Sequence, residues 1–554
     1  MTSASPGTPR APSTVDRLAE RHLADQARLD PFFATEIGVP GHDDRLTDFS
    51  PGACTARAAA ARAAVGSLAS APVADDVDRV TVATMTASLH REIALADAGE
   101  RVGDCNVIAS PLQALRDVFD LMPTGTAEAR EVFLARLSGI PACVDGIIDG
   151  LRYRIAHGPP QSRRQAALVA EQSDAAVAGI AAGTGALAAD ARLADATTRA
   201  LDRAGSAFAT LAAVLRNEVA PAAITDDAVG RERYLRFLPA YLGADVDPDE
   251  AYAWGLDHLA AIVDEQSVLA AEIVPGGGVR EAISHLNTLP QYAIHDRHAF
   301  IEWMQDLSDR AVDGLAGIQV DLPPRLTRLE CRLAPSQTGI IYYTQPSADL
   351  TRPGRMWWSV PPAQTVFHTW QETTTVFHEG VPGHHLQLGS AIVSDDLNAW
   401  RKLASFTSGH GEGWALYAER LMGELGWLDD PGDRMGMLDS QRLRAARVVV
   451  DIGVHCRLPV PAALGGGIWD ADKAWRFLTG SVAMDHAVLR FELHRYLGWP
   501  GQAPSYALGQ RVWEQTRAAA LRSHPDWSLR DFHTRALAFG GVSLDVLADE
   551  LTAG

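Results

Sequence analysis

Three histidines and one glutamate that stand close together carry the residue types needed to bind a metal ion and activate water. His378 and Glu379 end an apolar segment, and His384 and His385 follow shortly after it. In the common zinc-hydrolase pattern H-E-x-x-H, two histidines four residues apart share one helix face, and the glutamate acts as a base. Here the residue four positions after His378 is Pro382, and the next histidine comes two positions later. The residue types of a zinc hydrolase are therefore present at an unusual spacing.

A break in the helix would bring the two histidines together. Six residues of a regular helix turn through about 600° and rise about 9 Å, so an unbroken helix would hold His378 and His384 apart. Pro382 disfavours helical geometry at the residue before it, and Gly383 can take a positive φ. His385 is roughly in phase with His378 but about two turns away, which makes it the lesser candidate. Because such a cluster is costly to bury without a cation, the sequence predicts a metal bound by His378 and His384.

A third ligand is expected from a later segment, since hydrolytic zinc keeps three protein ligands and one open position for water. Glu412 is the candidate, because it opens a predicted helix after a glycine-rich turn and could point toward a neighbouring helix. Glu419 lies seven residues further on the same face and could instead orient a histidine. His410 remains a rival ligand, and Glu412 could also be an ordinary first-turn acid.

A charged stripe runs along the otherwise apolar segment Gln441–Cys456. Arg444, Arg447, Asp451 and His455 fall on it. One interpretation is an ion pair between Arg447 and Asp451 at four-residue spacing, with His455 donating to a neighbour. The other makes His455 an electrophile toward a developing oxyanion, positioned by Asp451.

Most of the chain is predicted to be helical, with one short β-element directly before the histidine motif. Helical patterns cover 15–29, 56–68, 77–98, 127–151 and 191–219 in the first half, and 365–377, 386–393, 413–425 and 441–456 in the second. Strand patterns concentrate at 326–333, 339–344 and 355–360. Breaks in these patterns predict a disordered tail over 1–13, an N-terminal helical region over 14–225 and a metal-binding catalytic region over 226–554.

Composition excludes several classes of protein. The 554 residues contain 49 Lys and Arg against 69 Asp and Glu, and this net charge of −20 argues against nucleic acid or an anionic membrane as partner. Uncharged stretches fall short of the roughly 18 apolar residues of a membrane span. The five cysteines are scattered without a CxxC pair, which is typical of thiols in a reducing compartment. The first residues lack a signal-peptide core, so we expect a cytoplasmic protein.

The segment His378–Gln387 reads His-Glu-x-x-Pro-Gly-His-x-x-Gln, and in this the sequence resembles a family known as domain of unknown function 885. The resemblance is firm over roughly residues 330–515 and loose over the helical remainder. Further matching segments follow in the expected order: Tyr342-Tyr343, Arg352–Gly354, Glu412–Ala415, Arg447–His455, Arg495-Tyr496, Pro500–Ala503, Ser505-Tyr506 and Gly509. His410 and the insertion Gly465–Gly467 lie outside the pattern.

That family is similar in layout to helical zinc peptidases of the thimet/neurolysin, Taq carboxypeptidase and angiotensin-converting-enzyme groups. The resemblance implies a mostly α, large helical zincin-like fold with a small β-element before the metal-binding helix. It implies one Zn²⁺ held by His378, His384 and Glu412, with Glu379 as general base. Tyr506 would reach over the metal, and Tyr342 or Tyr343 would lie on an edge strand that holds substrate. The implied substrate-binding residues are Tyr342, Tyr343, Arg447, Arg495 and Gln502.

The expected function is a zinc-dependent hydrolase that cleaves an amide in a small peptide or an acylated amino compound. Glu379 would take a proton from a metal-activated water, and His455 or Tyr506 would help the metal to hold the oxyanion. One alternative is a zinc-dependent esterase, lactonase or other small-molecule hydrolase. Another is a non-catalytic helical protein whose metal site is closed by a fourth ligand such as His385 or His410. Manganese or cobalt could use the same ligands. The sequence also leaves a homodimer as an alternative to a monomer.

Overall fold

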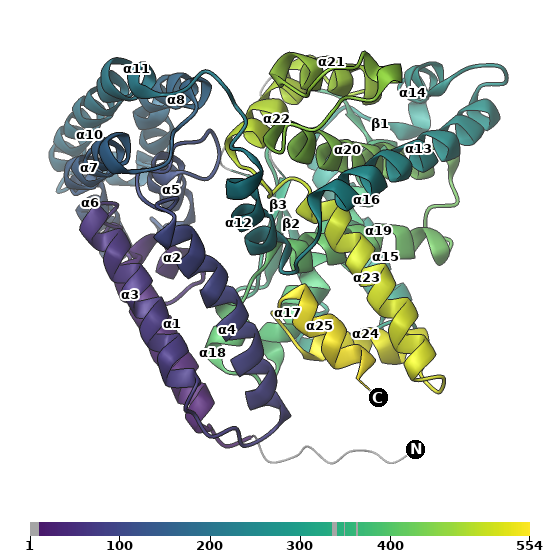
Figure 1. The fold of residues 1–554 in the computed structure, drawn as a ribbon, viewed down its shortest axis with the longest axis horizontal. Helices are drawn as coiled ribbons and strands as arrows, with labels where there is room; N and C mark the ends of the chain where they lie inside the picture. Colours follow the sequence, from purple (N-terminus) through teal and green to yellow (C-terminus); the bar gives the residue numbers. More distant parts are fainter. Residues whose placement is uncertain (1–9, 335–340, 348–349, 362–363, 554) are drawn as a thin grey trace.

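The computed structural model describes residues 10–334, 341–347, 350–361 and 364–553, and most of them are helical. The N-terminal helices form one side of the molecule, and the later helices surround the small sheets on the other side (Figure 1). The mostly helical fold predicted from the sequence is therefore confirmed.

The first half of the chain consists of helices joined by short turns. Their bounds are α1 Thr14–Leu29, α2 Pro31–Glu36, α3 Pro51–Leu68, α4 Asp76–Asp97, α5 Pro111–Asp117, α6 Ala127–Ser138, α7 Ile140–His157, α8 Arg163–Ala182, α9 Gly185–Ala188, α10 Ala194–Val214 and α11 Ala220–Ala222. The single helix predicted over 127–151 is wrong, because the chain divides into α6 and α7 at Gly139. A side chain at Gly139 would collide with Leu46, so the glycine allows this close packing.

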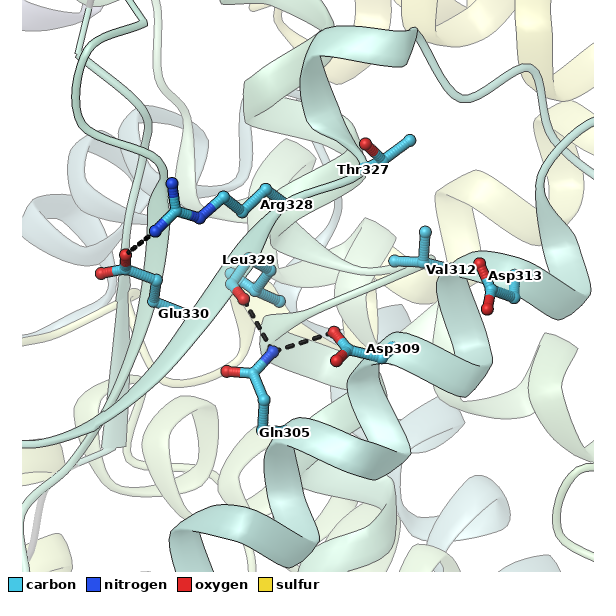
Figure 2. Close-up of a pocket in the computed structure, with 8 residues that line it drawn as sticks. All are labelled: Gln305, Asp309, Val312, Asp313, Thr327, Arg328, Leu329 and Glu330. Carbon is cyan, nitrogen blue, oxygen red and sulfur yellow. Dashed lines mark hydrogen bonds and ion pairs between the residues drawn. The ribbon is translucent and has the colours of Figure 1, made fainter.

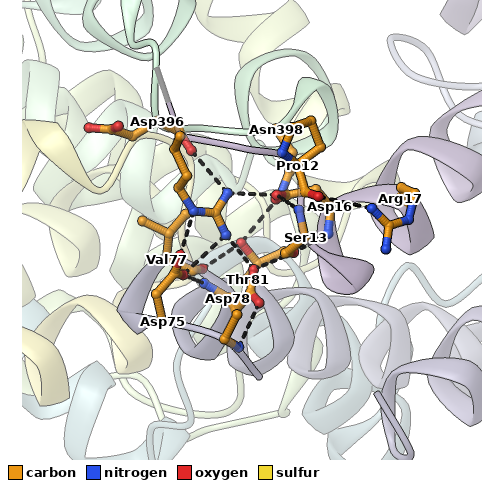
Figure 3. A network of polar contacts seen from close by, with 12 residues as sticks. Pro12, Ser13, Asp16, Arg17, Asp75, Val77, Asp78, Thr81, Asp396 and Asn398 are labelled. Atoms are coloured by element: carbon orange, nitrogen blue, oxygen red, sulfur yellow. Dashed lines mark hydrogen bonds and ion pairs between the residues drawn. The ribbon is translucent and has the colours of Figure 1, made fainter. Parts of the chain in front are cut away.

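The start of α1 is fixed by contacts that reach into the predicted tail. Ser13 caps the helix, with its hydroxyl accepting from the Asp16 N–H and its own N–H donating to the Asp16 carboxylate. The Arg10 guanidinium pairs with Asp16 and Asp75, each at 2.6 Å, and also contacts Asp78. Figure 3 labels these three acidic partners and Ser13. Residues 10–13 of the predicted tail are therefore bound to folded helices, and residues 1–9 lie outside the described residues.

In the second half, the bounds of the helices are α12 Arg231–Leu242, α13 Pro248–Ile273, α14 Val279–Leu286, α15 Arg297–Leu315, α16 Thr369–Glu379, α17 His384–Val393, α18 Ala399–Leu403, α19 Ser408–Glu424, α20 Pro431–His455, α21 Ala471–Ser481, α22 His486–Gly498, α23 Ser505–Ser523, α24 Leu529–Ala538 and α25 Leu544–Thr552. Of these, helices α13, α16, α19, α21, α22 and α23 pack against α20. Residues Val448–Val450 and Ile452 of α20 are completely buried. α20 is thus a core helix, as its apolar sequence indicates.

Among the described residues, the larger sheet has three strands and lies where the strand patterns predict it. Strands β2 (Leu329–Leu333), β4 (Gly354–Trp358) and β3 (Ile341–Thr344) form one sheet in the order β2-β4-β3. β4 runs parallel to β2 and antiparallel to β3, with Tyr343 opposite Met356. The first two residues of the predicted strand 339–344 lie outside the described residues. β5 (Phe367–His368) pairs with β1 (Ala293–Ile294), so the helix predicted to begin at residue 365 begins at Thr369.

Buried apolar side chains form two large clusters. The members of one cluster lie between residues 234 and 551, together with Val80, and those of the other lie between residues 32 and 219. A third, smaller cluster joins α1, α3 and α4 to Trp400 of α18. The predicted boundary near residue 225 stays a prediction. Every helix among the described residues is too short or too polar to cross a membrane.

Candidate metal centre

The helix carrying His378 breaks where the sequence predicts it. α16 ends at Glu379 and α17 begins at His384, and the two histidine rings lie perpendicular with 4.9 Å between their centroids. Gly383 has a φ of −73°, so the expected positive φ is wrong. The glycine is needed for another reason, because a Cβ there would collide with the backbone carbonyl of His378. The Trp414 indole N–H donates to the Pro382 carbonyl at 2.8 Å and holds the loop in place.

Glu412 reaches the same point from α19. Its Oε2 lies 3.3 Å from His378 Nε2 and 3.5 Å from His384 Nε2. One ligand atom from each of the three residues lies within 4.8 Å of the other two, and no second group of this kind occurs in the part of the chain that the structure describes. Two imidazole nitrogens and one carboxylate oxygen are the donors of a three-ligand catalytic zinc site.

The electrostatics of this cluster favour a cation. Burial alone would lower the pKa of His378, but Glu412 and Glu419 raise it to about 10. Burial would raise the pKa of Glu412, yet the two histidines hold it well below its usual value. Without a metal ion, the two carboxylates therefore favour the protonated form of His378. A divalent metal ion could bind to the three side chains of this cluster and would bring more positive charge than a proton.

Glu419 orients the first histidine from the side away from the cluster. Its Oε1 lies 2.8 Å from His378 Nδ1, and its Oε2 accepts from Thr374 Oγ1 at 2.8 Å and from Ser440 Oγ at 3.4 Å. This arrangement assigns the Nδ1 proton to His378 and leaves Nε2 free to bind a metal. Glu419 thus supports a ligand and is not one itself. Thr374 and Ser440 were not singled out from the sequence, because only the packing of α16 and α20 against α19 makes them partners.

We expect Glu419→Gln to weaken zinc binding by about 10- to 100-fold, because the amide is a poorer acceptor for the His378 N–H and lacks the charge that raises the basicity of the ligand. Competition with a chromophoric chelator measures the affinity. Glu424→Gln is the matched control, since Glu424 lies on the same helix but is half exposed and pairs with Arg517. Equal zinc affinities of the two variants would contradict the orienting role.

Glu379 lies next to the cluster and has the properties of a base. Burial raises its pKa, and the charges of His378 and His384 oppose that rise. Its Oε2 is buried without a hydrogen-bond partner among the described residues, and so is His384 Nδ1. Buried polar atoms are rarely left unpaired, so Glu379 Oε2 indicates a place for a water or a substrate group.

The other two histidines near the motif, His385 and His410, lie outside the cluster. His385 Nε2 lies 2.7 Å from the Leu326 carbonyl, and its Nδ1 lies 2.8 Å from the Tyr343 hydroxyl. His410 Nδ1 lies 3.3 Å from Gln387 Nε2, and its ring packs on Trp513. Neither histidine joins the cluster, so a site closed by one of them as fourth ligand has no support in the geometry.

The tyrosines predicted to hold substrate lie on β3, an edge strand of the described sheet. Tyr343 stacks on His384 with 6.5 Å between ring centroids, while its hydroxyl is bonded to His385. Tyr342 stacks on Trp357 of β4 instead, because neighbouring residues of a strand point to opposite faces. Tyr343 therefore borders the metal centre, and Tyr342 is directed away from it.

His455 does not reach the cluster. Its Nε2 lies 2.9 Å from the Tyr496 carbonyl, and its Nδ1 lies 3.4 Å from the Val229 amide nitrogen. Both ring nitrogens are therefore engaged by the backbone, which leaves none for an oxyanion. Asp451 accepts from the Tyr234 hydroxyl at 2.6 Å and the Gly501 N–H at 3.0 Å, so the Arg447–Asp451 pair considered from the sequence does not form either.

Tyr506 is brought beside Glu412 by a close crossing of α19 and α23. A Cβ on Gly413 would collide with the backbone of Gly509, and Ser408 and Ser505 share a hydrogen bond of 2.8 Å. Burial and the Glu412 carboxylate raise the pKa of Tyr506. The phenol therefore keeps its proton at neutral pH and can donate it to a hydrogen bond near the metal ligands.

Arg447, Arg495 and Gln502 also lie together, next to Tyr506. Arg495 Nη2 donates to Gln502 Oε1 at 2.7 Å, and both guanidinium groups pack on the Tyr506 ring. Their shared ion-pair partner is Glu492, which was missed from the sequence. Its position three residues before Arg495 on one helix face was the available signal.

A separate surface hollow of about 590 Å³ lies between α15 and β2 (Figure 2). It is lined by Gln305, Asp309, Val312, Asp313 and Thr327–Glu330. Gln305 bonds to Asp309 and to the Leu329 carbonyl. Glu330 pairs with Arg328, which also lines the hollow, and with Arg332 and Arg355. The candidate metal ligands do not line it.

Solved structures of other proteins share the fold of this chain over nearly its whole length. A family model described as "Bacterial protein of unknown function (DUF885)" matches residues 31–551. A crystal structure of a protein from Colwellia psychrerythraea superposes with a TM-score of 0.83 at 20% identity, covering 97% of this chain and 98% of that one. A structure from Shewanella oneidensis gives 0.74 at 16% identity, covering 98% and 100%. Both are described as a putative lipoprotein, the second of unknown function. No curated protein matches this chain.

Proposed function

For this chain, which belongs to the DUF885 family of bacterial proteins of unknown function, we propose a metal-dependent hydrolase that cleaves an amide bond. The observation that carries the proposal is the convergence of His378 Nε2, His384 Nε2 and Glu412 Oε2. Beside them lies Glu379, whose buried Oε2 has no partner among the described residues. Three protein ligands leave an open coordination position, which distinguishes catalytic from structural zinc sites.

The donor set fits one Zn²⁺, held by His378, His384 and Glu412. Such an ion would supply Lewis acidity toward a substrate carbonyl and would lower the pKa of a water molecule. Glu379 would accept the proton of that water and pass it to the leaving nitrogen, for which its raised pKa is suited. Tyr506 would donate a hydrogen bond to the oxygen on which negative charge develops. Tyr343 would line the substrate site next to His384.

The predicted zincin-like arrangement is part of this proposal. It is supported by the succession of a small sheet with an edge strand, a helix bearing His378 and Glu379, and a later helix that supplies a carboxylate. Placement in the cytoplasm stays a prediction, as does the absence of nucleic acid and membrane partners. The alternative of an ester or lactone hydrolase uses the same groups, because metal-activated water attacks either type of carbonyl.

A substrate library with chelator controls tests the proposal. The library holds dipeptides, N-acyl amino acids, esters and lactones, and each hydrolysis is measured with zinc-loaded protein, after 1,10-phenanthroline, and after zinc is restored. We expect hydrolysis of amides that the chelator abolishes and zinc restores. Hydrolysis that survives complete removal of the metal would contradict the proposal, and cleavage of esters alone would favour the alternative substrate class.

A further inference from the structure

Two buried arginines beside the metal centre share a single acidic partner. Arg447 of α20 lies 2.7 Å from Glu492 Oε2, and Arg495 of α22 lies 3.3 Å from Glu492 Oε1. The three side chains are only 6% to 11% exposed. Within the described part of the chain, neither guanidinium has an ion pair with another acid. The trio therefore carries two positive charges against one negative charge in a buried site, and this excess of one positive charge is costly without an anion.

Several donors of the two guanidinium groups are also uncommitted. Arg447 uses Nε toward the Tyr496 hydroxyl at 2.8 Å and Nη2 toward Glu492. Its Nη1 has no partner among the described residues. Arg495 uses Nη2 toward Gln502 and Nη1 toward Glu492, and its Nε is buried without a partner among those residues. The excess positive charge and the free N–H donors of the two arginines both indicate a binding site for a negatively charged hydrogen-bond acceptor.

Tyr506 connects this arginine pair to the metal ligands. The Arg447 and Arg495 guanidinium carbons lie 4.8 Å and 5.9 Å from the centre of its ring. Its hydroxyl lies 3.4 Å from Arg495 Nη2, and the charge of Glu412 acts on that same hydroxyl. One tyrosine side chain therefore contacts both arginines and is also under the influence of the candidate metal ligand Glu412.

We infer that Arg447 and Arg495 bind a carboxylate of the substrate, and that the substrate is a peptide or an N-acyl amino acid cut at the amide next to its free α-carboxylate. The cleavage part of this inference rests on the proposed function. An α-carboxylate is separated from the scissile nitrogen by one carbon, which suits an anion site that shares Tyr506 with the candidate metal ligand Glu412. A planar carboxylate also matches the fork of a guanidinium better than other anions do. Hydrolysis adds the water hydroxyl to the acyl carbon and the one remaining proton of that water to the nitrogen. The C–N bond breaks, and a carboxylic acid and a free amino acid are released.

The binding test uses the full-length chain with Glu379→Gln, which slows turnover, and pairs of N-acetyl-amino acids with their N-acetyl-amino-acid amides. Each pair differs only in whether the end is a carboxylate or a neutral amide. We expect the carboxylates to raise the melting temperature, in zinc-loaded and in metal-free protein, and the amides not to. Added Arg447→Lys or Arg495→Lys should weaken carboxylate binding by about 10- to 100-fold, because lysine keeps the charge but loses the fork.

The matched control is Arg154→Lys. Arg154 is equally buried and pairs with Glu100 at 2.9 Å, but it lies on α7 among the N-terminal helices. This variant should keep the preference for carboxylates. Equal shifts by carboxylates and amides, or a preference that survives both lysine variants, would overturn the inference. If the lysine variants fail to fold, the comparison of carboxylate with amide in metal-free protein still decides it.

Wild-type turnover separates the inference from the proposed function. Equal hydrolysis of peptides with free and amidated C-termini would leave the hydrolase standing and overturn the carboxylate site. Carboxylate binding that depends on the two arginines, in a protein that hydrolyses nothing in the library, would retain the site and count against the hydrolase.

Discussion

Replacing Glu379 by glutamine should lower the rate of hydrolysis by about 10² to 10⁴-fold, the range typical for loss of a general acid–base group. Glutamine has nearly the same shape but cannot accept a proton from water. Because the three metal ligands are unchanged, the zinc content should stay at that of the wild type. Steady-state kinetics on the substrate found in the library, together with elemental analysis of the same samples, measures both quantities.

The matched control for this variant is Glu372→Gln. Glu372 lies two turns earlier on α16, and burial raises its pKa to about 7, but it does not contact the cluster. We expect this variant to keep its turnover. A Glu379→Gln protein that retains both zinc and the wild-type rate would show that Glu379 is not the base.

Replacing His384 by alanine should weaken zinc binding by more than the 10- to 100-fold expected for the orienting residue Glu419, because a direct ligand is lost. Zinc binding to the folded wild type should raise its melting temperature, since the unfolded chain does not assemble the site. In His384→Ala this zinc-dependent rise should disappear. Thermal melts with and without zinc, and the zinc content after dialysis, provide the measurement.

The control for His384→Ala is replacement of the neighbouring residue, His385→Ala. His385 is completely buried and links Leu326 to Tyr343, so its loss should lower the melting temperature of the metal-free protein. The His385→Ala variant should nevertheless bind one zinc ion. Loss of zinc from His385→Ala with retention in His384→Ala would reverse the assignment of the two histidines.

The broken helix of the metal centre could be predicted from the sequence because its cause is local. A proline and a glycine between His378 and His384 exclude a regular helix, whatever the surroundings. The role of Gly383 was predicted less well, because the collision that it avoids is with the His378 carbonyl, a contact that exists only once the loop is folded. Glu412 was expected on its residue type and on the family resemblance.

The contacts that could not be predicted join distant segments. His455 lies on the same stripe as Arg447, and nothing in its neighbourhood shows that the backbone at Val229 and Tyr496 engages both its nitrogens. Asp451 is likewise four residues from Arg447, but Tyr234 and Gly501 hold it instead. Helix periodicity identifies the face on which a residue lies, whereas the partner across that face depends on tertiary packing.

Diffraction from crystals of the zinc-loaded protein, recorded at the zinc absorption edge, tests the central claim most directly. The account predicts one anomalous peak, at about 2.0 to 2.2 Å from His378 Nε2, His384 Nε2 and a carboxylate oxygen of Glu412, with no fourth protein ligand. A peak at another place, a fourth ligand from His385 or His410, or a chain that binds no zinc would contradict it.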